Sequence, residues 1–97
     1  MYKYILNIKF YIQEGTKVFD MLNFDKKTIG LRQSIKAIEN DFAKIVLVAR
    51  DVDETIARRI KELCAVRSVE IVFVDTMKQL GKASGIDVEA AVVCLLK

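Results

Sequence analysis

Apolar and polar positions change their spacing along the chain, and each spacing predicts one kind of element. In residues 2–12 apolar side chains alternate with mostly polar ones, which is typical of a half-buried strand. Residues 44–49 form a run rich in β-branched side chains, which predicts a central strand covered on both faces. A helix over 31–40 is predicted because apolar side chains recur there at helical spacing, at Leu31, Ile35, Ile38 and Phe42.

The remaining segments extend this alternation of strands and helices. The further predicted elements are a short helix beginning at Thr16, strands over 27–29, 69–74 and 90–96, a helix over about 54–66, and a helix that carries Leu80 and Ala83. Strands that alternate with helices of about ten residues are typical of a layered α/β domain. The order of the elements predicts helices on both faces of a small sheet.

A length of 97 residues predicts one domain. We expect residues 16–97 to form that domain and residues 1–15 to be an N-terminal appendage. Three interpretations of the appendage stay open: an extra edge strand, a segment that pairs with a second copy of the chain, or an artefact of where translation was assigned to start. Residues 2–12 are too short and too polar to span a bilayer. We expect a monomer, with dimerisation through residues 1–15 as the alternative.

The composition argues against catalysis and against a metal site. The chain has no histidine, the residue that most often serves as a general base or a metal ligand. Three aspartates stand directly before predicted helices, where capping explains them: Asp51, Asp53 and Asp75. Cys64 and Cys94 lie 30 residues apart in apolar surroundings, so we expect buried thiols in a reducing cytosol. No catalytic set, cofactor or metal is therefore predicted.

The net charge of +3 is a mild basic excess, so its distribution matters more than its size. Four cations, Arg32, Lys36, Lys78 and Lys82, cluster around two glycine-containing segments. Three others, Arg58, Arg59 and Lys61, are expected elsewhere, on a solvated helix face where Glu54 and Glu62 stand four residues from Arg58.

The first glycine-containing segment is Gly30-Leu31-Arg32-Gln33-Ser34-Ile35-Lys36. Gly30 precedes a helix whose free N–H groups and partial positive charge suit a phosphate. Arg32 and Gln33 in the first turn carry groups that hydrogen-bond phosphates or base edges, and Lys36 follows one turn later. The alternative interpretation is a turn glycine followed by a solvated polar face.

The second segment runs from Met77 to Val88. Gly81 within a helix costs about 1 kcal/mol relative to alanine, so we expect a close backbone approach there. Gly85 is expected to end the helix in a left-handed conformation. Ile86 and Val88, on either side of Asp87, have two open interpretations: they fold back on the sheet, or they cover an unstacked base.

Three sequence blocks in the same order and at the same separations resemble the L7Ae-type ribosomal protein family, in particular its small bacterial members of the YbxF kind. The blocks are Gly30-x-x-Gln33-x-x-Lys36, Ile45-Val46-Leu47-Val48-Ala49-x-Asp51-x-Asp53 and Leu80-Gly81-Lys82-Ala83-x-Gly85-Ile86-x-Val88. The resemblance implies a three-layer α-β-α sandwich with a small mixed sheet of about four strands. It also implies a cytoplasmic, non-catalytic protein that binds kink-turns, sharply bent RNA elements in which tandem sheared G·A pairs flank a short bulge.

The resemblance also implies roles for individual residues. Gly30, Arg32 and Gln33 would sit against the G·A pairs and Lys36 on the RNA backbone, and the loop residues Ile86, Asp87 and Val88, with Lys82 nearby, would cover a nucleotide flipped from the bulge. The expected partner is a structured RNA, whether ribosomal RNA, a riboswitch or another kink-turn.

The chain departs from the family in a few places. Archaeal members usually carry Asn and Glu where this chain has Arg32 and Gln33, many members have proline at the position of Glu54, and residues 1–15 have no counterpart in the small bacterial members. Two other functions stay open: a protein-interaction module of the same fold without RNA binding, and a fragment of an RNA-modifying enzyme.

Overall fold

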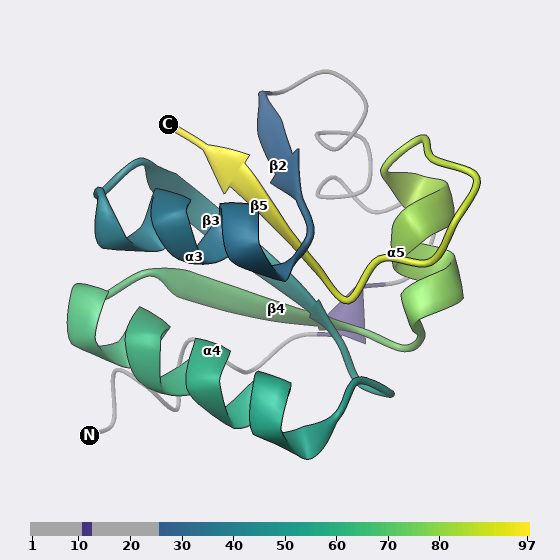
Figure 1. The fold of residues 1–97 in the computed structure, drawn as a ribbon, viewed down its shortest axis with the longest axis horizontal. Helices are drawn as coiled ribbons and strands as arrows, with labels where there is room; N and C mark the ends of the chain where they lie inside the picture. Colours follow the sequence, from purple (N-terminus) through teal and green to yellow (C-terminus); the bar gives the residue numbers. More distant parts are fainter. Residues whose placement is uncertain (1–10, 13–25) are drawn as a thin grey trace.

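The computed structural model describes residues 11–12 and 26–97 (Figure 1). Its elements are β1 (Tyr11–Ile12), β2 (Lys27–Ile29), α3 (Leu31–Glu39), β3 (Ala43–Ala49), α4 (Glu54–Arg67), β4 (Glu70–Val74), α5 (Met77–Ala83) and β5 (Val92–Leu96). Every element predicted between residues 27 and 97 is present. The predicted helix at Thr16, and the predicted strand over 2–12 apart from β1, lie outside the described residues.

The described strands form one mixed sheet in the order β1-β4-β3-β5-β2. β3 and β4 are parallel, whereas β5 runs antiparallel to both β3 and β2. β1 pairs in parallel with β4, with Tyr11 opposite Phe73, and adds a two-residue edge strand to the four strands between residues 27 and 97, the number that the family resemblance implied. The mixed sheet is therefore confirmed.

Helices cover both faces of the sheet, which confirms the three-layer α-β-α sandwich (Figure 1). α3 and α4 pack on one face, and α5 packs on the other. β3 shows why its sequence is apolar at successive positions: Val46 and Val48 belong to the core under α3 and α4, whereas Leu47 and Ala49 belong to the core under α5. A strand covered on both faces has no side that favours polar residues.

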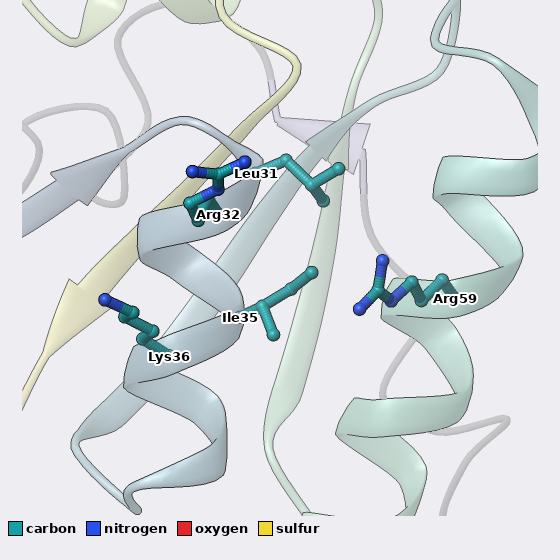
Figure 2. A pocket seen from close by; sticks show the side chains of 5 residues that line it. All are labelled: Leu31, Arg32, Ile35, Lys36 and Arg59. Carbon is teal, nitrogen blue, oxygen red and sulfur yellow. The ribbon is translucent and has the colours of Figure 1, made fainter.

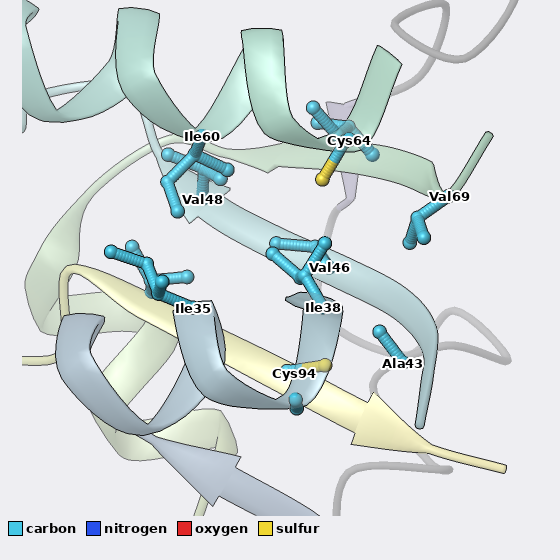
Figure 3. Close-up of a cluster of buried hydrophobic side chains, with 12 residues drawn as sticks. Ile35, Ile38, Ala43, Val46, Val48, Ile60, Cys64, Val69 and Cys94 are labelled. Carbon is cyan, nitrogen blue, oxygen red and sulfur yellow. The ribbon is translucent and has the colours of Figure 1, made fainter. Parts of the chain in front are cut away.

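Figure 3 shows the larger core between the sheet and the pair α3 and α4. Ile38 of α3 and Ile60 of α4 are fully buried there. Phe42, predicted on the apolar face of the helix over 31–40, is 60% exposed, so this part of the prediction is wrong. The helix ends at Glu39 and Asp41 adopts a left-handed backbone with φ of 64°, so the turn carries Phe42 out of the helical register.

Cys64 and Cys94 are buried in this core, as predicted. Burial raises the pKa of the Cys64 thiol from 9.0 to about 12, with a smaller contribution from the nearby Cys94. Burial likewise raises the pKa of Cys94 to about 11. A thiol with such a pKa is almost entirely protonated at neutral pH and is a poor nucleophile.

These thiols are expected to make the fold lose stability in alkali. Above pH 9 the thiol of Cys64 ionises in the unfolded chain but stays protonated in the folded one, so its contribution is complete below pH 9 and is lost towards pH 12. In this range the free energy of unfolding falls by about 1.4 kcal/mol per pH unit for each thiol. Urea unfolding at pH 8, 9 and 10 measures this decline. Cys64→Ala should show a shallower decline than the unsubstituted chain, and identical slopes would contradict the assignment.

Candidate functional site

The start of α3 and the end of the loop that follows α5 approach each other at one end of the sheet (Figure 1). The backbone N–H of Gly30 donates to the carbonyl oxygen of Val92 at 2.8 Å. Gly30 links the end of β2 to α3, and Val92 begins β5 directly after the loop of residues 84–91 that follows α5. Because β2 and β5 are antiparallel neighbours, the start of α3 and the end of this loop lie side by side.

Gly30 has a backbone conformation that favours glycine, with φ of 107° and ψ of 159°. This region is essentially closed to residues with a Cβ. The first turn of α3 contains no acidic residue, and glycine has no side chain with which to cap the helix. The helix therefore begins with its N–H groups and partial positive charge directed past Gly30.

The residues after Gly30 divide between core and solvent. Ser34 and Ile35 are buried, and the hydroxyl of Ser34 lies 3.1 Å from that of Thr28 in β2, which ties the first turns of α3 to the sheet. Arg32, Gln33 and Lys36 are exposed. Figure 2 shows Arg32 and Lys36 projecting from α3 one turn apart, on the side away from α4.

The loop after α5 is held close to the helix. The Cβ of an alanine at position 81 would overlap the carbonyl oxygen of Val88 and would lie 3.0 Å from its carbonyl carbon. The close approach predicted at Gly81 is therefore present, and its partner is the loop backbone. Gly85 has φ of 82°, as expected for the residue that ends the helix. The N–H of Ile86 donates to the carbonyl of Gly81, which closes the turn.

The two aliphatic residues of this loop have different surroundings. Ile86 is half-buried and packs against the core under α5, so the fold-back interpretation holds for it. Val88 is 69% exposed, and its neighbour Asp87 is exposed as well. Lys82 is exposed on the last turn of α5. Asp87 and Val88 therefore form the outward tip of the loop.

The three aspartates that were expected to cap helices have different surroundings in the structure. Asp53 stands at the N-cap of α4, although its side chain makes no capping hydrogen bond. Asp51 instead accepts from the N–H of Met77 at 2.8 Å, so it caps α5 together with Thr76. Asp75 pairs with Arg50 at 3.9 Å. Asp51 and Asp75 therefore have structural contacts, whereas Asp53 only occupies the position of a cap.

A groove of about 350 Å³ runs between α3 and α4 (Figure 2). Its lining consists of Leu31, Arg32, Ile35, Lys36 and Arg59. The expectation that Arg59 lies away from the other cations is thus wrong. Arg59 stands three residues after Ile56 and four before Leu63, two apolar residues packed against the core, and this spacing turns it towards α3.

The other cations are more dispersed than the sequence suggested. Lys78 and Lys82 belong to α5, on the opposite face of the sheet from Arg32 and Lys36. Arg58 pairs with Glu54 at 3.8 Å, as its helical spacing predicts. The described part of the chain contains no group of three or more potential metal-ligating side chains. Nor does it contain a helix long and apolar enough to cross a membrane.

Comparisons with known proteins identify a family, two bacterial relatives and a structure with the same fold. A model of the ribosomal protein L7Ae/L30e/S12e/Gadd45 family matches residues 16–97. An RNA-binding protein of Caldanaerobacter subterraneus is 42% identical over 68% of this chain and 80% of its own length. One from Halalkalibacterium halodurans is 41% identical over 71% and 84%. The structure of a Giardia lamblia 15.5kD RNA binding protein has the same fold, with a TM-score of 0.80 and 21% identity over 92% of this chain and 79% of that one.

Proposed function

The chain belongs to the ribosomal protein L7Ae/L30e/S12e/Gadd45 family, and from this membership we propose that it is a non-catalytic RNA-binding protein that recognises kink-turns. The observation that carries the proposal is the hydrogen bond between Gly30 and Val92, because it joins an uncapped helix start to a neighbouring loop. The names of its bacterial relatives, RNA-binding proteins, support the same class of partner.

Each part of this surface has a proposed role. Gly30, Arg32 and Gln33 face the sheared G·A pairs, where the absence of a Cβ at Gly30 lets the RNA backbone come close. Lys36 contacts a phosphate. At the loop, the exposed Val88 and Asp87 cover the nucleotide flipped from the bulge, with Ile86 supporting them from inside and Lys82 nearby.

The charge of the surface suits the bent form of the RNA. A kink-turn brings phosphates of two helical arms close together, and their mutual repulsion opposes the bend. Cations placed at the bend offset that repulsion and release condensed counterions. The protein binds the kinked state more tightly than the open one, and the equilibrium shifts towards the kink by that difference.

We further propose that residues 16–97 form the RNA-binding domain of a cytoplasmic monomer and that residues 1–15 are an appendage to it. The natural partner is a structured RNA that contains a kink-turn. The extent of the family match, residues 16–97, supports this domain boundary.

A gel-shift titration tests the proposal with two RNAs, a kink-turn and the same sequence with its G·A pairs replaced by Watson–Crick pairs. We expect the intact kink-turn to bind at least tenfold more tightly. Fluorescence energy transfer between dyes on the two arms should show the arms closing when protein is added. Equal affinity for the two RNAs would reject kink-turn recognition.

Lys36→Ala is expected to weaken binding to both RNAs. Loss of one phosphate contact lowers the slope of log affinity against log salt by about 0.9, which amounts to about fivefold in affinity at 150 mM salt. Lys44→Ala is the matched control, because Lys44 is also exposed but lies at the opposite end of the sheet. If Lys36→Ala left the salt dependence of affinity unchanged, Lys36 would not contact a phosphate of the RNA.

Gln33→Ala is expected to change selectivity more than overall affinity. An amide that reads a base edge contributes about 1–3 kcal/mol of discrimination. The preference for the intact kink-turn over the G·A-disrupted RNA should therefore fall by about tenfold. The salt dependence should stay the same, since Gln33 carries no charge. If the affinity for both RNAs fell equally, Gln33 would instead contact the sugar-phosphate backbone of the RNA.

A further inference from the structure

We propose that Arg59, at the basic end of the groove between α3 and α4, holds a phosphodiester from one helical arm of the RNA, while the exposed Arg32 and Lys36 stand on the other side of α3. This inference rests on the proposed function and extends the binding surface from α3 to a second helix. Its chemistry is that of a nucleic-acid backbone phosphate, recognised without regard to base sequence.

The first support is the arrangement of the groove. Figure 2 shows Arg59 reaching from α4 towards Ile35, while Arg32 and Lys36 extend from α3 on the side away from α4. Leu31 and Ile35 supply an apolar lining beside Arg59. An apolar wall lowers the local dielectric constant, which strengthens the attraction between a cation and a phosphate.

The second support is the pairing of charges. No ion pair within 4.0 Å involves Arg32, Lys36 or Arg59 among the described residues. Arg58, the residue next to Arg59, is in contrast paired with Glu54. The guanidinium group of Arg59 therefore keeps its planar donors for an external acceptor, and phosphate oxygens match that geometry.

The charge along the groove gives the bound phosphate a definite position. Beyond Ile35 and Arg59 the groove continues as a cavity of about 270 Å³, whose lining also includes Glu39 and Glu62. These carboxylates repel a polyanion. The RNA backbone is therefore confined to the end nearest the start of α3, which is also the end nearest the proposed kink-turn surface.

Arg58 and Arg59 form a matched pair for the test, because they are adjacent, exposed arginines on one helix. Binding to the kink-turn RNA is measured between 50 and 300 mM salt for Arg59→Gln and Arg58→Gln. Arg59→Gln should lower affinity about fivefold at 150 mM salt and reduce the salt slope by about 0.9. Arg58→Gln should leave both unchanged. Arg59→Lys, which keeps the charge, should restore the slope.

An RNA with one arm shortened identifies the phosphate that is bound. For the arm that reaches the groove, truncation should lower affinity for the unsubstituted protein and abolish the difference between it and Arg59→Gln. If the unsubstituted protein binds the kink-turn but Arg59→Gln and Arg58→Gln behave alike, the groove inference is wrong and the proposed function stands. If the unsubstituted protein does not discriminate the kink-turn, the proposed function fails as well.

Discussion

Gly81→Ala is expected to destabilise the protein by roughly 2–3 kcal/mol, although alanine is the better helix former. Its Cβ would overlap the carbonyl oxygen of Val88, a backbone atom that has no rotamer into which to withdraw. The strain of overpacking reaches about 3 kcal/mol, which exceeds the gain of about 1 kcal/mol in helix propensity. Urea unfolding measures the loss. Relief of the overlap would displace the loop tip, so affinity for the kink-turn should fall as well.

Gly85→Ala is the matched control for this prediction. Gly85 follows the same helix, and a Cβ there would meet nothing within 4 Å. Its φ of 82° makes alanine unfavourable by about 1 kcal/mol for conformational reasons alone. A larger loss in Gly81→Ala than in Gly85→Ala would reveal the overlap with Val88, because helix propensity alone favours alanine at position 81. If Gly81→Ala proved as stable as the unsubstituted chain, the close packing of loop and helix would be wrong.

The layers of the fold could be predicted from the sequence because each layer leaves its own periodicity. The apolar run of β3 indicated a strand covered on both faces, and the helical spacing of apolar residues in α3 indicated an amphipathic helix. The order of the strands could not be predicted in this way. β5 lies between β3 and β2, and such pairing depends on contacts between distant segments rather than on local pattern.

Local pattern also failed where the chain leaves a helix. Phe42 continues the spacing of the preceding apolar residues, yet α3 ends three residues earlier and Asp41 takes a left-handed conformation. Helical spacing predicts which side chains are buried only for residues that lie within the helix. Asp51 is a second example: its place before α4 suggested a cap for that helix, whereas the fold brings it to the start of α5.

The roles of the candidate site residues stay a prediction. The sequence drew attention to Gly30 and to the loop after α5, and the hydrogen bond from Gly30 to Val92 joins the start of α3 to the end of that loop. Arg59 was not identified, because its place in the lining of the groove depends on how α3 and α4 pack against each other. The spacing of Arg59 from Ile56 and Leu63 was the available signal, since it places the residue beside the apolar face of α4.

Gly30→Ala is expected to damage both the fold and the binding surface. With φ of 107° and ψ of 159°, the backbone at Gly30 lies in a region that costs other residues about 1–3 kcal/mol. A Cβ there would meet nothing within 4 Å, so the cost arises from the backbone conformation and not from a clash. The chain can relieve it by rotating the start of α3, which would move Arg32 and Gln33 together. We therefore expect a larger loss of kink-turn affinity than Lys36→Ala causes.

Ile60→Val separates the effect on binding from the effect on stability. Ile60 is fully buried in α4, so the loss of one methylene costs about 0.5–1.5 kcal/mol without altering the helix start. Both variants are measured by urea unfolding and by gel shift under conditions in which each remains folded. Ile60→Val should bind the kink-turn like the unsubstituted protein, whereas Gly30→Ala should bind it at least tenfold more weakly. Equal affinities for the two variants would mean that the conformation of Gly30 serves only the fold, because a surface that recognised the RNA through the start of α3 would not tolerate its rotation.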